Sequence, residues 1–143
     1  MHKTISIFLI FIILLSTLSA CGIKKPEIED YEWEMQTIMH ISDEQIVYDA
    51  LAEESASHPE AKIIKMMLIA KDGEIRITDV TNGKTYEGTY TVSGRNPKGT
   101  DYHVTIADHA GYATVAMTEY ADGTEKPTLP ISLDRYSICF YAK

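Results

Sequence analysis

From residue 31 onward, apolar and polar residues alternate along most of the chain. Residues 31–37 alternate large apolar with polar side chains, which predicts a half-buried strand that runs to about residue 41. Residues 84–92 do the same, with Tyr86 and Tyr90 on one face. Further strand-like runs lie at residues 63–70, 74–80, 102–106, 112–120, 129–133 and 136–142. The pattern therefore predicts about eight short strands.

Turn residues separate these runs. Asp72-Gly73 and Asn82-Gly83 favour type I′ turns, whose twist matches antiparallel strands. Residues 94–99 indicate a longer loop, and Pro127 and Pro130 are expected to limit the start of the strand at 129–133. Successive hairpins favour an antiparallel up-and-down barrel or half-barrel, because closure removes exposed strand edges. A sandwich is the alternative architecture.

One segment after the first strand has the signals of a helix start. Ser42 and Gln45 have the spacing of a capping box. Ile41 and Ile46 occupy the positions of a hydrophobic staple around it. We therefore expect one amphipathic helix over 43–56.

The first residues have the pattern of a secretory signal peptide. Lys3 is followed by an apolar run over 5–15, which is shorter than the ~20 residues that span a bilayer. Small residues then precede Cys21. This pattern predicts that residues 1–20 are a signal peptide removed from the mature chain.

Leu18-Ser19-Ala20-Cys21 resembles the lipobox of bacterial lipoproteins. The resemblance implies cleavage before Cys21, lipid on that cysteine, and attachment to the extracytoplasmic side of the cell membrane. The alternative is an ordinary secretory signal with a chance cysteine. Residues 21–30 would then be the lipidated cysteine and a polar tether of roughly 16 Å, and 31–143 a single β-rich domain.

Charge and cysteine content exclude several classes of protein. Residues 1–20 contain one lysine and no acidic residue, so the mature chain has a formal charge of −9, against −8 for the full chain. An acidic chain without a cluster of basic residues is not expected to bind nucleic acid. Lipidation of Cys21 would leave Cys139 as a lone thiol, so no disulfide is expected within the chain.

No catalytic motif stands out. The sequence contains no Gly-x-Ser-x-Gly elbow, no phosphate-binding glycine loop and no helical His pair of a zinc protease. A metal site from Asp101, His103, Asp108 and His109 is conceivable, but solvated turn residues explain them better. We therefore predict neither an enzyme nor a bound metal or cofactor.

Residues 75–78 and 82–92 resemble the core hairpin of small bacterial lipocalin-like lipoproteins, which belong to the calycins. Trp33 on the first strand is similar to the calycin pattern, although Tyr31 stands where lipocalins have glycine. The expected helix over 43–56 is similar in position to the helical lid of fatty-acid-binding proteins. The resemblance implies a barrel with a lid.

Aromatic residues on the predicted strands are the candidate ligand-binding residues. An aromatic cavity with tyrosine hydroxyls would suit a small apolar or amphipathic ligand, although aromatic side chains also fill β cores. We therefore consider a membrane-anchored ligand-binding protein first. The alternative is an envelope protein-protein interaction module with a filled core and no ligand. The predicted lining consists of Trp33, Tyr86, Tyr90, Tyr102 and Tyr136.

Overall fold

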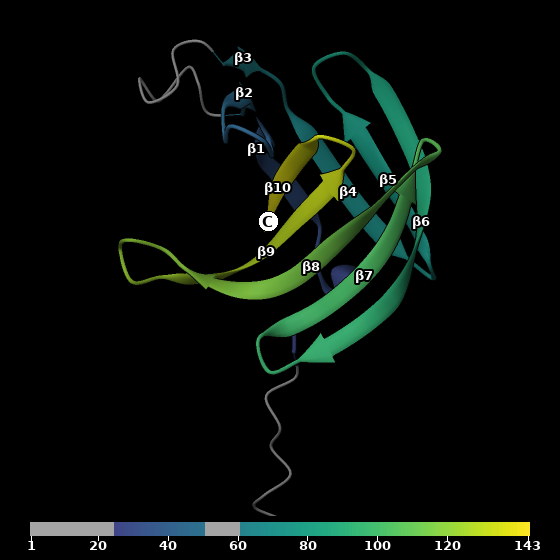
Figure 1. Ribbon diagram of the computed structural model, residues 1–143, viewed down its shortest axis with the longest axis vertical. Helices are drawn as coiled ribbons and strands as arrows, with labels where there is room; N and C mark the ends of the chain where they lie inside the picture. The colour runs from purple at the N-terminus through teal and green to yellow at the C-terminus, as the bar shows by residue number, and fades with distance from the viewer. Residues whose placement is uncertain (1–24, 51–60) are drawn as a thin grey trace, which may run out of the picture.

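Eight antiparallel strands close into a barrel in the computed structural model, which describes residues 25–50 and 61–143 (Figure 1). Each strand pairs with the next along the chain, and the last strand pairs back onto the first. The prediction of an antiparallel, mainly β barrel is confirmed, and it is closed. Its strands are β1 (Trp33–His40), β4 (Met66–Lys71), β5 (Glu74–Asp79), β6 (Lys84–Asn96), β7 (Gly99–Ile106), β8 (His109–Glu119), β9 (Glu125–Leu133) and β10 (Tyr136–Ala142).

The prediction of a helix over 43–56 is wrong for the part of that range that the structure describes. Residues 41–43 form a turn and β2 (Ile46–Asp49) follows, while 51–56 lie outside the described residues. The Gln45 amide donates to the Asp43 carboxylate at 3.2 Å, and Glu44 has a φ of 56°. The capping-box residues therefore belong to a tight β turn.

Pairing with β1 explains why this segment is extended. β4 pairs with β1 only at Trp33 and Glu34 and then diverges, which leaves the rest of that edge open. β2 occupies the vacated edge at Thr37 to Met39, and the short β3 (Lys62–Ile63) adds to β2 in parallel. Ile46-Val47-Tyr48 is β-branched and aromatic, so its own preference agrees with this pairing.

The other turns show why two sequence expectations fail. β6 continues to Asn96, so 94–99 is not a longer loop, and the Asn96 side chain accepts from the Lys98 and Gly99 amides at 2.9 and 3.1 Å. β9 begins at Glu125, and it contains both prolines. Pro130 lies where the β8–β9 ladder is interrupted, because proline has no amide hydrogen to donate.

Of the two predicted type I′ turns, one forms. Asp72 and Gly73 both have positive φ, at 51° and 85°, as this turn requires. In the second turn only Gly83 has positive φ, at 67°. Its neighbour Asn82 instead donates two hydrogen bonds to the Asp79 carboxylate, at 2.9 and 2.8 Å. The β5–β6 connection is therefore a longer, side-chain-bonded turn.

Large side chains fill the barrel interior. Trp33, Leu68, Val115 and Phe140 have no exposed surface, although they come from strands all around the barrel. The buried apolar set also includes Met35, Ile38, Ala70, Ile75, Ile77, Tyr90, Tyr102, Val104, Ile106, Ala113, Leu129 and Ile131. These side chains form one continuous core.

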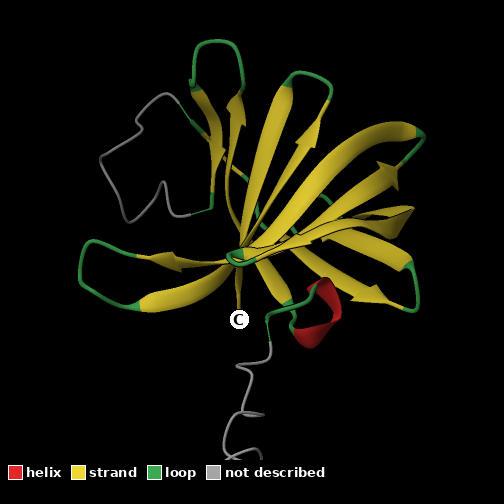
Figure 2. Ribbon diagram, turned by 60° about the horizontal axis from the view of Figure 1, so that its bottom comes forward, coloured by secondary structure: helices red, strands yellow, loops and turns green. Residues whose placement is uncertain are grey.

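One end of the barrel is closed by the first residues that the structure describes. The 3-10 helix η2 (Ile28–Asp30; red in Figure 2) lies at this end, where Glu29 bonds to Tyr90 beside Gly73 and the preceding Glu27 pairs with Arg95. Ile28 is 1% exposed and Pro26 is also buried. We call this the plugged end. The opposite end, formed by the β1–β2, β5–β6, β7–β8 and β9–β10 turns, is the distal end.

Candidate functional site

Cys21 lies outside the described residues, so its lipidation stays a prediction. Residues 25–30, which the sequence places in a flexible tether, belong to the folded barrel. Lys25 Nζ donates to the Asn96 carbonyl at 2.6 Å, and Arg95 pairs with Glu27 at 3.3 Å. Within the described ranges, no helix is long and apolar enough to cross a membrane.

Two of the predicted lining residues use their polar atoms to hold η2. Trp33 Nε1 donates to the Ile28 carbonyl at 2.8 Å. The Tyr102 hydroxyl donates to Glu27 Oε2 at 2.8 Å and accepts from the Ile28 amide at 3.1 Å. These three bonds satisfy buried groups that would otherwise be available to a ligand.

Tyr90 also holds η2 through hydrogen bonds of its hydroxyl. Its hydroxyl donates to the Glu29 carboxylate and accepts from the Gly73 amide at 3.2 Å, while its ring contacts Tyr102 edge-on at 5.6 Å between centroids. Burial, helped by the bond to Glu29, raises the pKa of Tyr90 to about 12. Burial raises the pKa of Tyr102 further, so both hydroxyls stay protonated near neutral pH.

The remaining two predicted residues lie elsewhere. Tyr86 is half-buried and pairs with Ile77 on the inner face of β5 and β6. Tyr136 is at the distal end, 38% exposed, with its ring 4.8 Å from that of His40. The structure therefore brings Trp33, Tyr90 and Tyr102 together beside η2 and separates Tyr136 from them.

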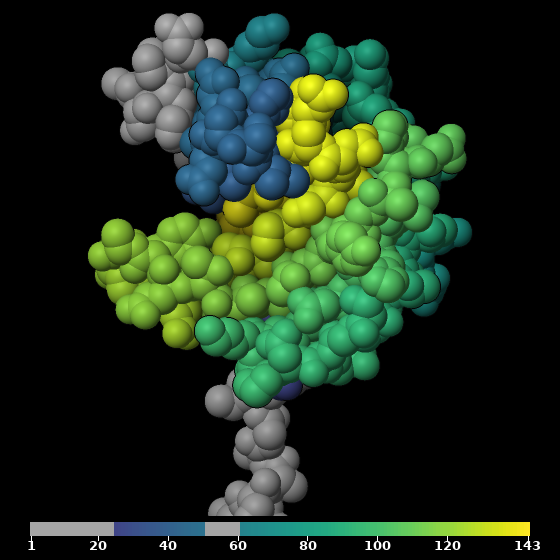
Figure 3. All heavy atoms as spheres, in the orientation of Figure 1, coloured from purple at the N-terminus to yellow at the C-terminus, as the bar shows by residue number. Residues whose placement is uncertain are grey.

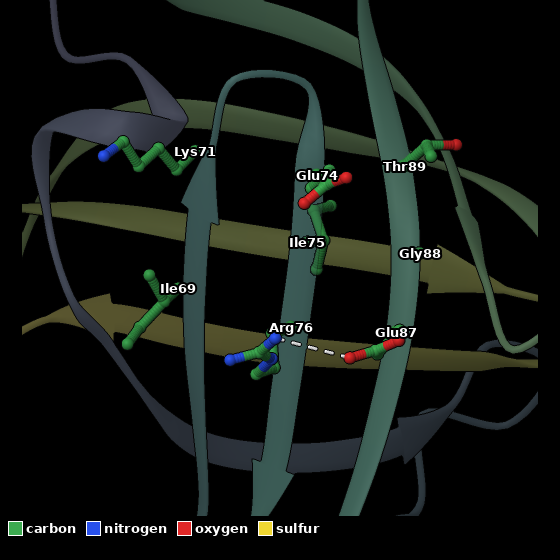
Figure 4. A pocket seen from close by; sticks show the side chains of 8 residues that line it. All are labelled: Ile69, Lys71, Glu74, Ile75, Arg76, Glu87, Gly88 and Thr89. Carbon is green, nitrogen blue, oxygen red and sulfur yellow. Dashed lines mark hydrogen bonds and ion pairs between the residues drawn. The ribbon is translucent and has the colours of Figure 1, made fainter.

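A hollow of about 340 Å³ lies on the barrel wall over β4, β5 and β6 (Figure 4). Ile69, Arg76 and Glu87 form a row across these strands, and Arg76 pairs with Glu87 at 3.4 Å. Both charged side chains are mostly solvent-exposed, which makes the pair weak. The hollow is lined by Ile69, Lys71, Glu74, Ile75, Arg76, Glu87, Gly88 and Thr89.

The distal end carries a connected surface that sequence reasoning missed. The Ile41 amide donates to the Arg135 carbonyl at 2.9 Å, which joins the β1–β2 and β9–β10 turns. His109 pairs with Asp134 at 2.7 Å, which joins the β7–β8 turn to the β9–β10 turn. Figure 3 shows the β1–β2 turn (blue) beside the β9–β10 turn (yellow).

We call this surface the distal rim: it consists of His40, Ile41, Asp43, His109, Asp134 and Tyr136. Ile41 is 48% exposed and lies at a turn, where a large apolar side chain is unexpected. The residues of the distal rim come from three turns that are far apart in the sequence, so only the strand order brings them together. The sequence pattern places Ile41 in a hydrophobic staple, so it gives no local signal of this surface.

The histidines, acids and thiol of the described ranges do not assemble into a metal site. No group of three or more such side chains is close enough to hold an ion there. Asp101 accepts from Asn96 and Thr114, at 3.1 and 2.8 Å, and the His103 ring packs against Tyr112. Burial raises the pKa of the Cys139 thiol, which favours its protonated form.

Comparison of the chain with models of known protein families, with curated proteins and with solved structures found no match in any of the three.

Proposed function

We propose that this protein is a lipid-anchored, extracytoplasmic barrel that acts as an interaction module of the bacterial cell envelope. It binds a partner protein on its surface and carries no small ligand inside. The observation that carries the proposal is the filled interior: Trp33, Tyr102 and Phe140 are at most 1% exposed, and Ile28 closes the plugged end.

The bonds at the plugged end support this choice over ligand binding. A ligand entering there would have to displace Ile28 and replace the hydrogen bonds of Trp33 and Tyr102. A buried donor or acceptor left without a partner costs about 1–3 kcal/mol. The aromatic side chains therefore act as core residues that fix the N-terminal segment.

The distal rim is the best candidate for the contact surface. It combines two exposed apolar side chains, Ile41 and Tyr136, with the carboxylates of Asp43 and Asp134. Exposed apolar residues surrounded by polar ones are typical of protein contact sites. Asp43 and Asp134 contact His40 and His109, and the exposed Arg135 lies in the same turn as Asp134. This surface therefore favours a partner with complementary charges around an apolar centre.

The interior is tested with a fluorescent fatty acid whose absorption overlaps tryptophan emission. Trp33, the single tryptophan, lies inside the barrel and would transfer energy to any ligand bound there. We expect no saturable transfer. Stoichiometric, saturable transfer that Phe140→Trp abolishes would overturn the filled-interior proposal.

The surface is tested by photo-crosslinking in cells, with the crosslinker placed at Ile41 or, as the control, at the exposed Thr91 of the barrel wall. We expect a discrete protein adduct from Ile41 that Asp134→Lys weakens. Identical adducts from both positions, unaffected by Asp134→Lys, would contradict the distal rim as the contact surface.

A further inference from the structure

The plugged end is tied to Cys21 by a very short stretch of chain. Residues 25–30 are bonded into the barrel, so only residues 22–24 connect it to the cysteine. Four residue steps separate Cys21 from Lys25, which limits the distance between their Cα atoms to about 14 Å. A lipid on Cys21 therefore holds this part of the barrel near the membrane surface.

The distal end is out of reach of such an anchor. β6 runs from Lys84 at the distal end to Asn96 at the plugged end, and 12 steps of about 3.3 Å span about 40 Å. Lys25 is bonded to Asn96, at the near end of this strand. The anchor thus holds the plugged end, which includes the β6–β7 turn beside Lys25, near the bilayer.

This turn carries positive charge in an otherwise acidic protein. Lys25 and Lys98 are exposed, and the Arg95 side chain is 57% exposed. Two acids lie among them. Glu27 is already bonded to Arg95 and Tyr102, and Asp101 is half-buried between Asn96 and Thr114.

The other acids of the plugged end lie outside the β6–β7 turn: Glu29 and Asp30 in η2, Asp72 and Glu74 in the β4–β5 hairpin, and Glu119, Asp122 and Glu125 around the β8–β9 turn. Glu29 is bonded to Tyr90, whose hydroxyl also meets Gly73, so Glu29 lies toward the β4–β5 turn with the exposed Asp72. Near the β6–β7 turn, by contrast, Val92 and Pro97 expose apolar surface. Basic and small apolar groups together suit the headgroup region of an anionic membrane.

We propose that the β6–β7 turn, with Lys25, Arg95 and Lys98, rests on anionic phospholipid headgroups and orients the barrel with its distal rim away from the membrane. This inference rests on the proposed lipidation of Cys21. The lipid supplies the attachment, and the basic residues select which side of the plugged end faces the bilayer. The distal rim is then presented to proteins at some distance from the membrane.

The test uses the full-length lipidated protein with Cys139→Ser, so that one introduced cysteine carries the fluorophore. Pro97→Cys labels the β6–β7 turn and Asn82→Cys labels the distal β5–β6 turn. The protein is reconstituted in phosphatidylcholine vesicles with nitroxide-labelled headgroups, with or without phosphatidylglycerol. We expect quenching severalfold stronger at position 97 than at 82, and a further increase at 97 with phosphatidylglycerol.

Charge reversal separates the anchor from the basic contact. Lys98→Glu should abolish the effect of phosphatidylglycerol at position 97, whereas Lys84→Glu, an exposed lysine at the distal end, should leave it unchanged. Equal quenching at both positions, or no response to phosphatidylglycerol, would overturn the orientation while leaving lipidation intact. An unmodified Cys21 in the mass spectrum of the same sample would overturn the proposed anchoring itself.

Discussion

The hydroxyl of Tyr102 lies 2.8 Å from Oε2 of Glu27, which precedes it by 75 residues. This bond joins the segment next to the predicted lipidation site to the middle of the barrel. It makes the N-terminal segment a structural part of the fold.

Tyr102→Phe should destabilise the protein by about 1–3 kcal/mol, because it leaves the buried Ile28 amide without an acceptor. The measurement is urea unfolding followed by Trp33 fluorescence. Tyr112→Phe is the control, since Tyr112 is 67% exposed and should change stability by less than about 0.5 kcal/mol. Equal effects of the two substitutions would show that η2 does not depend on Tyr102.

Alkaline pH should destabilise the barrel through Tyr90, whose hydroxyl is bonded to Glu29 of η2. The pKa of Tyr90 is raised from 10.0 to about 12 in the folded protein. Above pH 10 the unfolded chain therefore loses a proton that the folded chain keeps, so stability is fully present below pH 10 and falls as pH rises toward 12.

The measurement for this prediction is the urea midpoint between pH 9 and 12. Tyr90→Phe should be less stable than wild type at neutral pH but lose less stability across this range. If the variant and wild type lost stability in parallel, the raised pKa of Tyr90 would not be the cause.

Gly88→Ala should be strongly destabilising. A Cβ at Gly88 would overlap the Thr105 carbonyl on the neighbouring strand, and backbone cannot move as a flexible side chain can. Overpacking of this kind costs about 1–3 kcal/mol or more. Gly94→Ala, in the same strand, is the matched control, because its Cβ would meet only the Asp101 side chain at 3.6 Å. Similar thermal midpoints for the two variants would contradict the close strand approach.

Glu44→Gly distinguishes the observed turn from the helix that the sequence predicts. Glu44 has a φ of 56°, a region that costs a non-glycine residue about 1–2 kcal/mol. We expect the substitution to stabilise the protein by about 0.5–1 kcal/mol, measured as a rise in thermal midpoint. In a helix, glycine would instead destabilise by about 0.5–1 kcal/mol. A fall in the midpoint would favour the helix.

Local patterns predicted the eight strands of the barrel, though not all their bounds, and failed for the segment between β1 and β4, which contains β2 and β3. Alternation over 84–92 and the Asp72-Gly73 turn correctly indicated β6 and the β4–β5 hairpin. Ser42 and Gln45 suggested a helix because capping is a local signal. The open edge of β1, which recruits β2, depends on where β4 diverges, and that follows from the closure of the barrel.

The candidate site was predictable only in part for a similar reason. Alternation placed Trp33, Tyr90 and Tyr102 on inner faces, but no local pattern indicated that η2 would occupy the space beside them. The distal rim combines Ile41 with Asp134 and His109, from three separate turns. Such combinations require the strand order, which alternation alone does not specify.

Native mass spectrometry of the full-length protein, purified gently from host membranes, tests the central claim most directly. We predict a chain that starts at Cys21, carries covalent lipid on that residue and has no bound small molecule. A mass that retains residues 1–20, an unmodified Cys21, or a stoichiometric non-covalent small ligand would contradict an anchored barrel with a filled interior.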